Sequence, residues 1–251
     1  MGIIGKMIGG AIGFAIGGPL GAIAGASFGH AYDRTGNMKL KRESLTSMSS
    51  NQNAQLTFFV AVFSMLAKIA KADGKVSDRE IQSVQQFMNN DLNLDPQSKN
   101  MAMTIFREAV NSPQDFESFA LQFYESFKMQ PRIIELMIDI FIRVSIADGS
   151  MTQNEEKLIL SAVKIFHFGE SRYEAVKARY VKNTGKYYAI LDCKNKDSNE
   201  HIKKQYRKLV QDYHPDKIAS KGLPEEFTKF ANDKFREINE AYEKIKKERS
   251  I

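Results

Sequence analysis

Apolar and polar positions divide the chain into three parts, each with a helical pattern. Residues 7–29 are uncharged, and residues 54–182 place apolar positions at helical spacing without the period-two alternation of strands. Residues 198–213 and 224–247 are two strongly amphipathic stretches at the C-terminal end. The pattern therefore predicts an all-α protein.

The two C-terminal stretches predict an antiparallel pair of helices joined by a stiff turn. The first helix must end near Tyr213, because Pro215 disfavours helical geometry in the residue before it and has no N–H to donate. This leaves His214 extended and places Asp216 beyond it. The apolar face of the first helix comprises Ile202, Tyr206, Leu209 and Tyr213. The apolar stripe of the second, which we expect to face the first, comprises Phe227, Phe230, Ala231, Ile238, Ala241, Tyr242 and Ile245.

Three further features accompany the His-Pro-Asp turn: the opening Tyr187-Tyr188-x-x-Leu191, a Lys/Arg-rich face on the first helix, and the Arg-Glu-Ile-Asn-Glu-Ala-Tyr-Glu run at 236–243. In this order they resemble the J domain of Hsp70 co-chaperones, and we assign residues 185–251 to it. The resemblance implies that the trigger for ATP hydrolysis by a DnaK-type Hsp70 comprises His214, Pro215 and Asp216. It implies a docking face of Lys203, Tyr206, Arg207 and Lys208. The hydrolysis belongs to the partner, so we expect no enzyme activity in this chain.

Glycine recurs at every fourth position of the N-terminal segment, at Gly5, Gly9, Gly13, Gly17, Gly21, Gly25 and Gly29. Residues 7–29 are long enough to cross a bilayer core of about 30 Å, and lipid enforces the helix that glycine disfavours in water. The repeated small face predicts close approach of a second helix, and hence a homodimer. We predict a transmembrane glycine-zipper anchor over residues 1–31, bent at Pro19. The alternatives are a surface-lying helix, a flexible tail, or a cleaved signal peptide, which fits poorly because Lys6 is its only initial charge.

Basic residues set the expected orientation of this anchor. Four of them, Arg34, Lys39, Lys41 and Arg42, follow the span, whereas only Lys6 precedes it. The positive-inside rule then predicts a single-pass protein whose C-terminal domains face the cytoplasm. Residues 32–53 are polar and aperiodic, which predicts a linker.

Two segments of the middle domain, residues 72–80 and 147–155, resemble each other: each has Ala-Asp-Gly, then Ser or Thr, then Glu three positions later. One interpretation is purely structural. The glycines Gly74 and Gly149 can end helices in the left-handed conformation. The two Ser/Thr-x-x-Glu sequences are capping boxes that start the next helices.

The same pattern resembles the TerB (tellurite-resistance) fold, and we assign residues 54–182 to it. That resemblance implies a second interpretation, a hard-cation site formed by Asp73, Asp78, Glu80, Asp148 and Glu155. It is not an EF-hand, because the Asp/Asn ladder and terminal Glu are missing. Both interpretations stay open. The order of anchor, TerB-like domain and J domain is similar to the DjlA-type family of membrane-anchored co-chaperones, and this resemblance implies the bacterial inner membrane. A cation-sensing stress scaffold with an accessory J module is the alternative function.

Composition narrows the remaining possibilities. The single cysteine, Cys193, excludes disulfides within the chain and cysteine zinc clusters, so the zinc-binding client region of full-length DnaJ-type chaperones is missing. We expect no required cofactor. The net charge of +6 is concentrated on the J-like helix and beside the membrane segment, so we expect no nucleic-acid partner. The histidines are too dispersed in sequence to predict a site unaided; they are His30, His167, His201 and His214.

Overall fold

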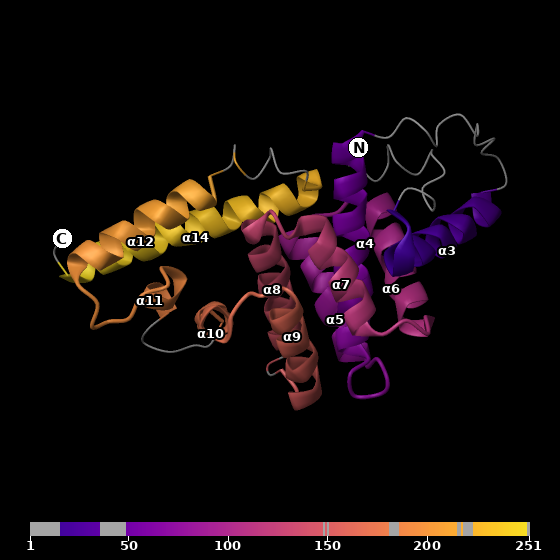
Figure 1. Ribbon diagram of the computed structural model, residues 1–251, viewed down its shortest axis with the longest axis horizontal. Coiled ribbons are helices and arrows are strands. Elements are labelled where there is room, and N and C mark those ends of the chain that lie inside the picture. The colour runs from indigo at the N-terminus through magenta and orange to yellow at the C-terminus, as the bar shows by residue number, and fades with distance from the viewer. Residues whose placement is uncertain are drawn as a thin grey trace.

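The computed structural model describes residues 16–35, 49–147, 149, 151–180, 186–214, 217 and 223–249. Every regular element within these ranges is helical, which confirms the predicted fold class (Figure 1). The elements are α3 (Gly18–Thr35), α4 (Ser50–Ala70), α5 (Asp78–Gln86), the π-helix η2 (Phe87–Asp91), α6 (Pro96–Asn111), α7 (Phe116–Phe127), α8 (Pro131–Ile146), α9 (Gln153–Ile165), α10 (Glu170–Ala178), α11 (Lys186–Ile190), α12 (Asn199–Asp212) and α14 (Glu225–Arg249).

Helix α4 is the centre of a bundle formed with α5, α6, α7, α8 and α9. Its side chains are buried on all sides from Leu56 to Ala67, because apolar residues occupy every face of this stretch. Among the described residues, α4 is the helix long and apolar enough to cross a membrane, and 83% of its apolar window lies inside the bundle. Such burial is expected of a core helix. Phenylalanine rings fill the space around it, with Phe58 lying 6.0 Å from Phe123 and 5.9 Å from Phe127 between ring centroids.

The two related segments start their helices as predicted. The Ser77 hydroxyl accepts the N–H of Glu80, whose carboxylate in turn accepts the N–H of Ser77. Thr152 and Glu155 make the same reciprocal pair at the start of α9. Both capping boxes are therefore present, and the glycines of both segments have positive φ, +95° at Gly74 and +123° at Gly149.

The glycine ladder changes direction within its described part. Gly17 and Gly18 have φ values of +61° and +59°, so the helical path breaks there and α3 starts afresh, with Pro19 in its first turn. A bend was predicted at Pro19, and the two glycines just before it supply the break. Helix α3 continues to Thr35, beyond the predicted boundary at residue 31. Gly5, Gly9 and Gly13 lie outside the described residues.

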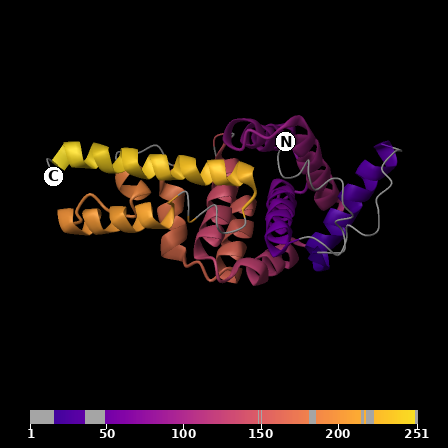
Figure 2. The ribbon, with the colours of Figure 1, turned by 90° about the horizontal axis from the view of Figure 1, so that it is seen from above.

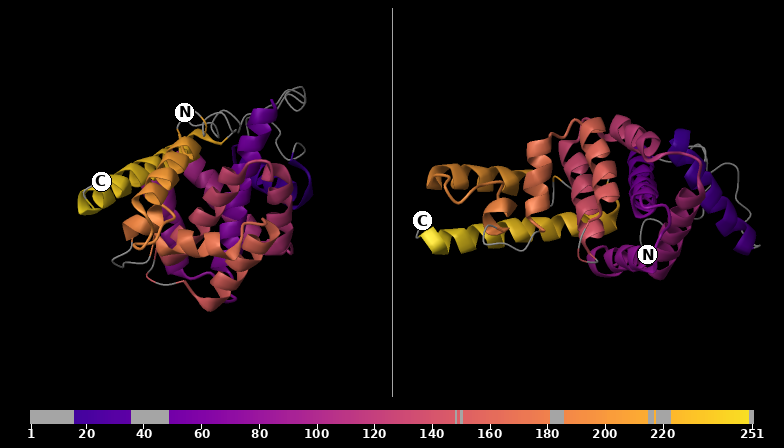
Figure 3. Two further views of the ribbon diagram at one scale, coloured as in Figure 1. Left: turned by 60° about the vertical axis from the view of Figure 1, so that its left-hand side comes forward. Right: turned by 90° about the horizontal axis from the view of Figure 1, so that it is seen from below.

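Helix α3 packs against α4, α6 and α7 on the side of the bundle opposite the C-terminal helices (Figures 2 and 3). Leu20 and Ala24 are fully buried in this contact. The Gln122 side chain of α7 joins the two parts, since its amide donates to the Gly17 carbonyl at 2.8 Å and accepts the N–H of Leu20 at 2.8 Å. The chain break at Gly17 and Gly18 is thus satisfied by a side chain from the bundle.

Helices α12 and α14 lie antiparallel and extend away from the bundle, with α11 beside them (Figures 1 and 2). We call this unit the C-terminal hairpin. Ser198 caps α12 by accepting the N–H of His201. A small core of its own comprises Tyr188, Ile190, Leu191, Cys193, Ile202, Leu209, Tyr213, Ile238, Ala241 and Ile245.

The predicted stripe of α14 is divided between two cores, which corrects the expectation that all of it faces α12. Phe227, Phe230 and Ala231 belong to the core of the central bundle instead. The Phe227 ring packs edge-on against Phe58 of α4, with 4.9 Å between centroids. Helix α14 is long enough to serve both cores: its first turns lie over the bundle and its remainder pairs with α12 (Figure 1).

Candidate functional site

His214 follows Tyr213, the residue that ends α12. The last helical contact is the Tyr213 N–H donated to the Leu209 carbonyl at 2.9 Å. The His214 side chain is exposed, and its ring lies edge-on to Phe235 of α14 with centroids 6.1 Å apart. The other two predicted trigger residues, Pro215 and Asp216, lie outside the described residues.

The predicted docking face lies along the outer side of α12. Arg207 and Lys208 are exposed, Lys203 is half-buried, and the opposite side of the helix is held in the hairpin core by Ile202 and Leu209. Lys203 and Arg207 share one face because they are four residues apart in a helix. The structure therefore presents cationic side chains and the exposed His214 from the same helix and its immediate end.

Tyr206 has a different place from the other docking residues. Its ring stacks on Tyr242 of α14 at 3.8 Å between centroids and 6° between planes, and its hydroxyl donates to the Asn239 side chain at 2.8 Å. Burial, followed by the charge of Glu243, raises the pKa of this hydroxyl. Tyr206 thus holds α12 against α14, so part of the predicted docking face is also part of the hairpin packing.

A buried ionic cluster next to the hairpin was missed by the sequence analysis. Glu135 of α8 is 2% exposed and lies 2.6 Å from an Arg132 nitrogen and 2.8 Å from Arg172. Burial alone would raise the pKa of Glu135, but the charges of Arg179, Arg132 and Arg172 outweigh it and lower the pKa to about 2. The sequence signal that could have found it is the pair of acids, Glu135 and Asp139, within the otherwise apolar stripe of α8.

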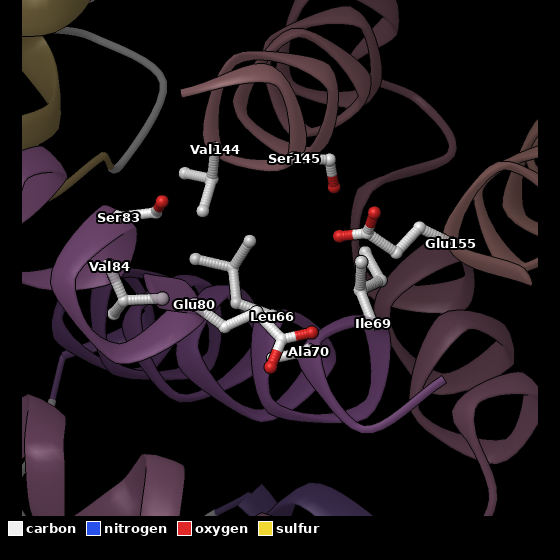
Figure 4. Close-up of a pocket in the computed structure, with 9 residues that line it drawn as sticks. All are labelled: Leu66, Ile69, Ala70, Glu80, Ser83, Val84, Val144, Ser145 and Glu155. Carbon is white, nitrogen blue, oxygen red and sulfur yellow. The ribbon is translucent and has the colours of Figure 1, made fainter. Parts of the chain in front are cut away.

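The predicted hard-cation residues are only partly brought together. The Glu80 and Glu155 side chains line a small cavity of about 20 Å³ with Ser83 and Ser145, and Figure 4 shows the Glu155 carboxylate beside the Ser145 hydroxyl. This volume accommodates about one water-sized particle. Burial raises the pKa of Glu155, hydrogen bonds from Thr152 oppose the rise, and the charge of Glu80 adds to it.

The other predicted ligands lie elsewhere. Asp73 accepts a hydrogen bond from the Asn154 amide at 2.6 Å, which ties the two related segments together. Asp78 is exposed in the first turn of α5 and does not line the cavity. Asp148 lies outside the described residues. Two of the five predicted acids therefore share a cavity.

The fold also brings one of the dispersed histidines next to the cysteine. Ligand-capable atoms of Cys193, Asp197 and His201 lie within 4.8 Å of one another. Burial, reinforced by the charges of Asp197 and Asp192, raises the pKa of the Cys193 thiol to about 12. Since metals bind the thiolate, we assign no site to this group.

Comparison with known proteins identifies all three parts of the chain in order. Residues 1–52 match the family model described as co-chaperone DjlA transmembrane domain, residues 59–178 match tellurite resistance protein TerB, and residues 186–251 match the DnaJ domain. No solved structure shows a significant match.

Several curated relatives are similar over the whole chain. Co-chaperone protein DjlA of Coxiella burnetii is 30% identical, and that of Aliivibrio fischeri 31%, each over all of both chains. Co-chaperone protein DjlA of Escherichia coli is 26% identical over 89% of each chain. These matches confirm the predicted resemblances to the J domain, the TerB fold and the DjlA-type family. The chain belongs to the DjlA family of co-chaperones, with an N-terminal transmembrane domain, a TerB domain and a C-terminal J domain.

Proposed function

We propose that this protein stimulates the ATPase of a DnaK-type Hsp70 at the cytoplasmic face of the bacterial inner membrane. The trigger is formed by His214, Pro215 and Asp216, and the basic face of α12 docks on the partner. The protein contributes no catalytic group, because the bond that breaks belongs to ATP on the Hsp70.

The observation that carries this proposal is that His214 is exposed just beyond the end of α12. The apolar side of α12 is packed in the hairpin core, while Arg207 and Lys208 face solvent. A row of cations on a rigid helix suits a transient contact, since complementary charge raises the association rate more than the affinity. The match of residues 186–251 to the DnaJ domain supports the same partner.

The test is the ATPase rate of a DnaK-type Hsp70 with the full chain in lipid nanodiscs. We expect stimulation by the wild type, loss of stimulation in His214→Gln, and retention in His201→Gln. His201 is a matched control, because it is an exposed histidine at the other end of the same helix. Stimulation by His214→Gln equal to that of the wild type would reject the assignment.

The proposal includes a single-pass topology and a homodimer. The topology is supported by the basic residues after the span and by the transmembrane-domain match. Its test is protease digestion of inside-out membrane vesicles: the C-terminal domains should be cleaved, and their protection would contradict the orientation.

Of the seven ladder glycines, we place the dimer seam at Gly5, Gly9 and Gly13. The other four lie at the chain break or in α3, which packs against the bundle; they are Gly17, Gly21, Gly25 and Gly29. Replacing the three seam glycines by Leu should abolish cross-linking in the membrane. Gly10→Leu, which lies off the ladder, should leave cross-linking intact. Equal cross-linking in the triple variant would reject the seam.

A second candidate function is cation sensing by the TerB-like domain, favoured by the shared cavity of Glu80 and Glu155. A divalent ion there would relieve the mutual repulsion of the two carboxylates. Calcium and magnesium titrations followed by amide chemical shifts test the site. Glu80→Gln and Glu155→Gln are informative variants, since Gln removes the charge but can still complete a capping box. Absence of shifts around these residues in the wild type would reject it.

A further inference from the structure

The TerB-like domain holds the two residues that precede the trigger histidine. Arg132 of α8 pairs with the carboxylate of Asp212, the last residue of α12, and with Glu135 of its own helix at 2.6 Å. Its guanidinium also lies over the ring of Tyr213, 5.5 Å from the ring centroid. The Arg132 side chain is 13% exposed, so this contact is largely shielded from water. The covalent neighbour of His214 is thus clamped by a side chain from another domain.

A second bridge runs through Arg179, which directly follows α10. Its guanidinium lies 2.9 Å from Asp192, in the turn after α11, and 3.4 Å from Glu135. Both Arg179 and Glu135 are nearly inaccessible to solvent. Two of the arginines that share the carboxylate of Glu135, Arg132 and Arg179, therefore each hold a different acid of the J domain.

A third bridge reaches α14. The Lys234 ammonium lies 3.1 Å from Asp139 of α8 and donates to the Tyr180 hydroxyl at 2.8 Å. We call the three bridges together the interdomain joint. Its cations are Arg132, Arg172, Arg179 and Lys234, and its anions are Glu135, Asp139, Asp192 and Asp212. Lys234 also pairs with Glu237 of its own helix at 3.2 Å, a side chain that is 41% exposed.

Buried charges of this kind set an orientation. Apolar contacts such as those of Phe227 and Phe230 would tolerate a rotation of one domain on the other. A desolvated ion tolerates much less, because a rotation that removes its partner leaves an uncompensated charge. In the observed orientation each ion of the joint has at least one oppositely charged partner across or beside the interface.

The joint does not cover the docking surface. It contacts Asp212 and Tyr213, whereas Arg207, Lys208 and His214 remain exposed. The clamp therefore supports the trigger from behind and does not cover it. A helix end that is already ordered loses less conformational freedom on docking, which favours association.

On the basis of the proposed function, we infer that Arg132, Glu135 and Arg179 are positioning residues for the His214 trigger, through which the TerB-like domain fixes the J domain in the orientation that meets Hsp70. They act through Asp212, Tyr213 and Asp192 and touch neither ATP nor the partner. Loss of the clamp should weaken productive docking and leave the trigger chemistry unchanged.

The test compares Arg132→Met with the wild type as full chains in lipid nanodiscs, measuring single-turnover Hsp70 ATPase against co-chaperone concentration. We expect the half-maximal concentration to rise roughly three- to tenfold, as for one or two newly mobile side chains, while the maximal stimulation is kept. Arg132→Lys should recover part of the loss. Arg107→Met, an exposed arginine on α6, is the matched control and should behave as the wild type.

A second readout follows the domain orientation itself. Spin labels at exposed Lys164 of α9 and Lys204 of α12, in a Cys193→Ser background, report the distance between the domains. The wild type should give a narrow distance distribution and Arg132→Met a broad one. If Arg132→Met does not fold, Asp212→Asn breaks the same pair at a side chain that is 26% exposed.

The outcomes separate the two claims. If the wild type stimulates Hsp70 and the joint variants do so with the same half-maximal concentration, the inference is overturned and the proposed function stands. Failure of the wild type to stimulate would overturn the proposed function. An equally narrow distance distribution in the joint variants would overturn the orienting role of the joint independently of Hsp70.

Discussion

Truncation of Phe227 to alanine should destabilise the TerB-like domain, although Phe227 lies in the J-domain helix α14. The side chain is fully buried, and its ring lies 4.9 Å from Phe58, 6.3 Å from Phe59 and 6.5 Å from Phe87 between centroids. Phe58 and Phe59 belong to α4, the central helix of the bundle. The substitution therefore opens a cavity against the core of one domain from the helix of another.

The expected cost is about 4 kcal/mol, within the range found for buried phenylalanines replaced by alanine. A value at the lower end of that range is not expected, because three aromatic neighbours lose an edge or face contact. At about 1.4 kcal/mol per factor of ten, amides of α4 that exchange by global unfolding should exchange faster by roughly three orders of magnitude.

Hydrogen exchange measured by mass spectrometry on the full chain in nanodiscs provides the assay. Ile245→Ala is the matched control, because Ile245 is also fully buried and lies on the same helix, but in the hairpin core. It should release α12 and change α4 far less than Phe227→Ala does. Protection of α4 in Phe227→Ala equal to that of the wild type would refute the shared core.

Three further predictions address single interactions. The pKa of Glu135 falls from 4.5 to about 2 on folding. Ionised Glu135 therefore contributes about 3 kcal/mol to the free energy of unfolding, a contribution that is complete above pH 4.5 and is lost as the pH falls toward 2. Acid unfolding followed by circular dichroism should therefore lose this pH dependence in Glu135→Gln, and an unchanged acid profile would contradict it. Tyr206→Phe should lower the free energy of unfolding, measured by thermal unfolding, by about 1 kcal/mol, because the hydrogen bond to Asn239 is lost while the ring stack stays. Loss of Hsp70 stimulation in this variant would instead show a direct docking role for the hydroxyl. Gln122→Ala should speed hydrogen exchange of the Leu20 amide, since it removes the side-chain oxygen that accepts this N–H. An unchanged exchange rate would show that the apolar face of α3 suffices to hold the helix.

Much of this protein follows from local features of the sequence. The helical periods, the capping boxes at Ser77 and Thr152, and the end of α12 before Pro215 involve residues within a few positions of each other, so the same rules hold in any fold. The order of the three domains followed from motifs of the same short range. These features sufficed to place His214 at an exposed helix end.

The tertiary structure decided which faces meet. A helical period shows that Phe227 and Ile238 lie on one stripe, but it cannot show that the first packs on α4 and the second on α12. Likewise, a buried acid of α8 such as Glu135 acquires its long-range partners only when α8, α10 and α12 converge. Long-range partners are chosen by the simultaneous burial of all apolar faces and the pairing of every buried charge, and no local pattern contains that choice.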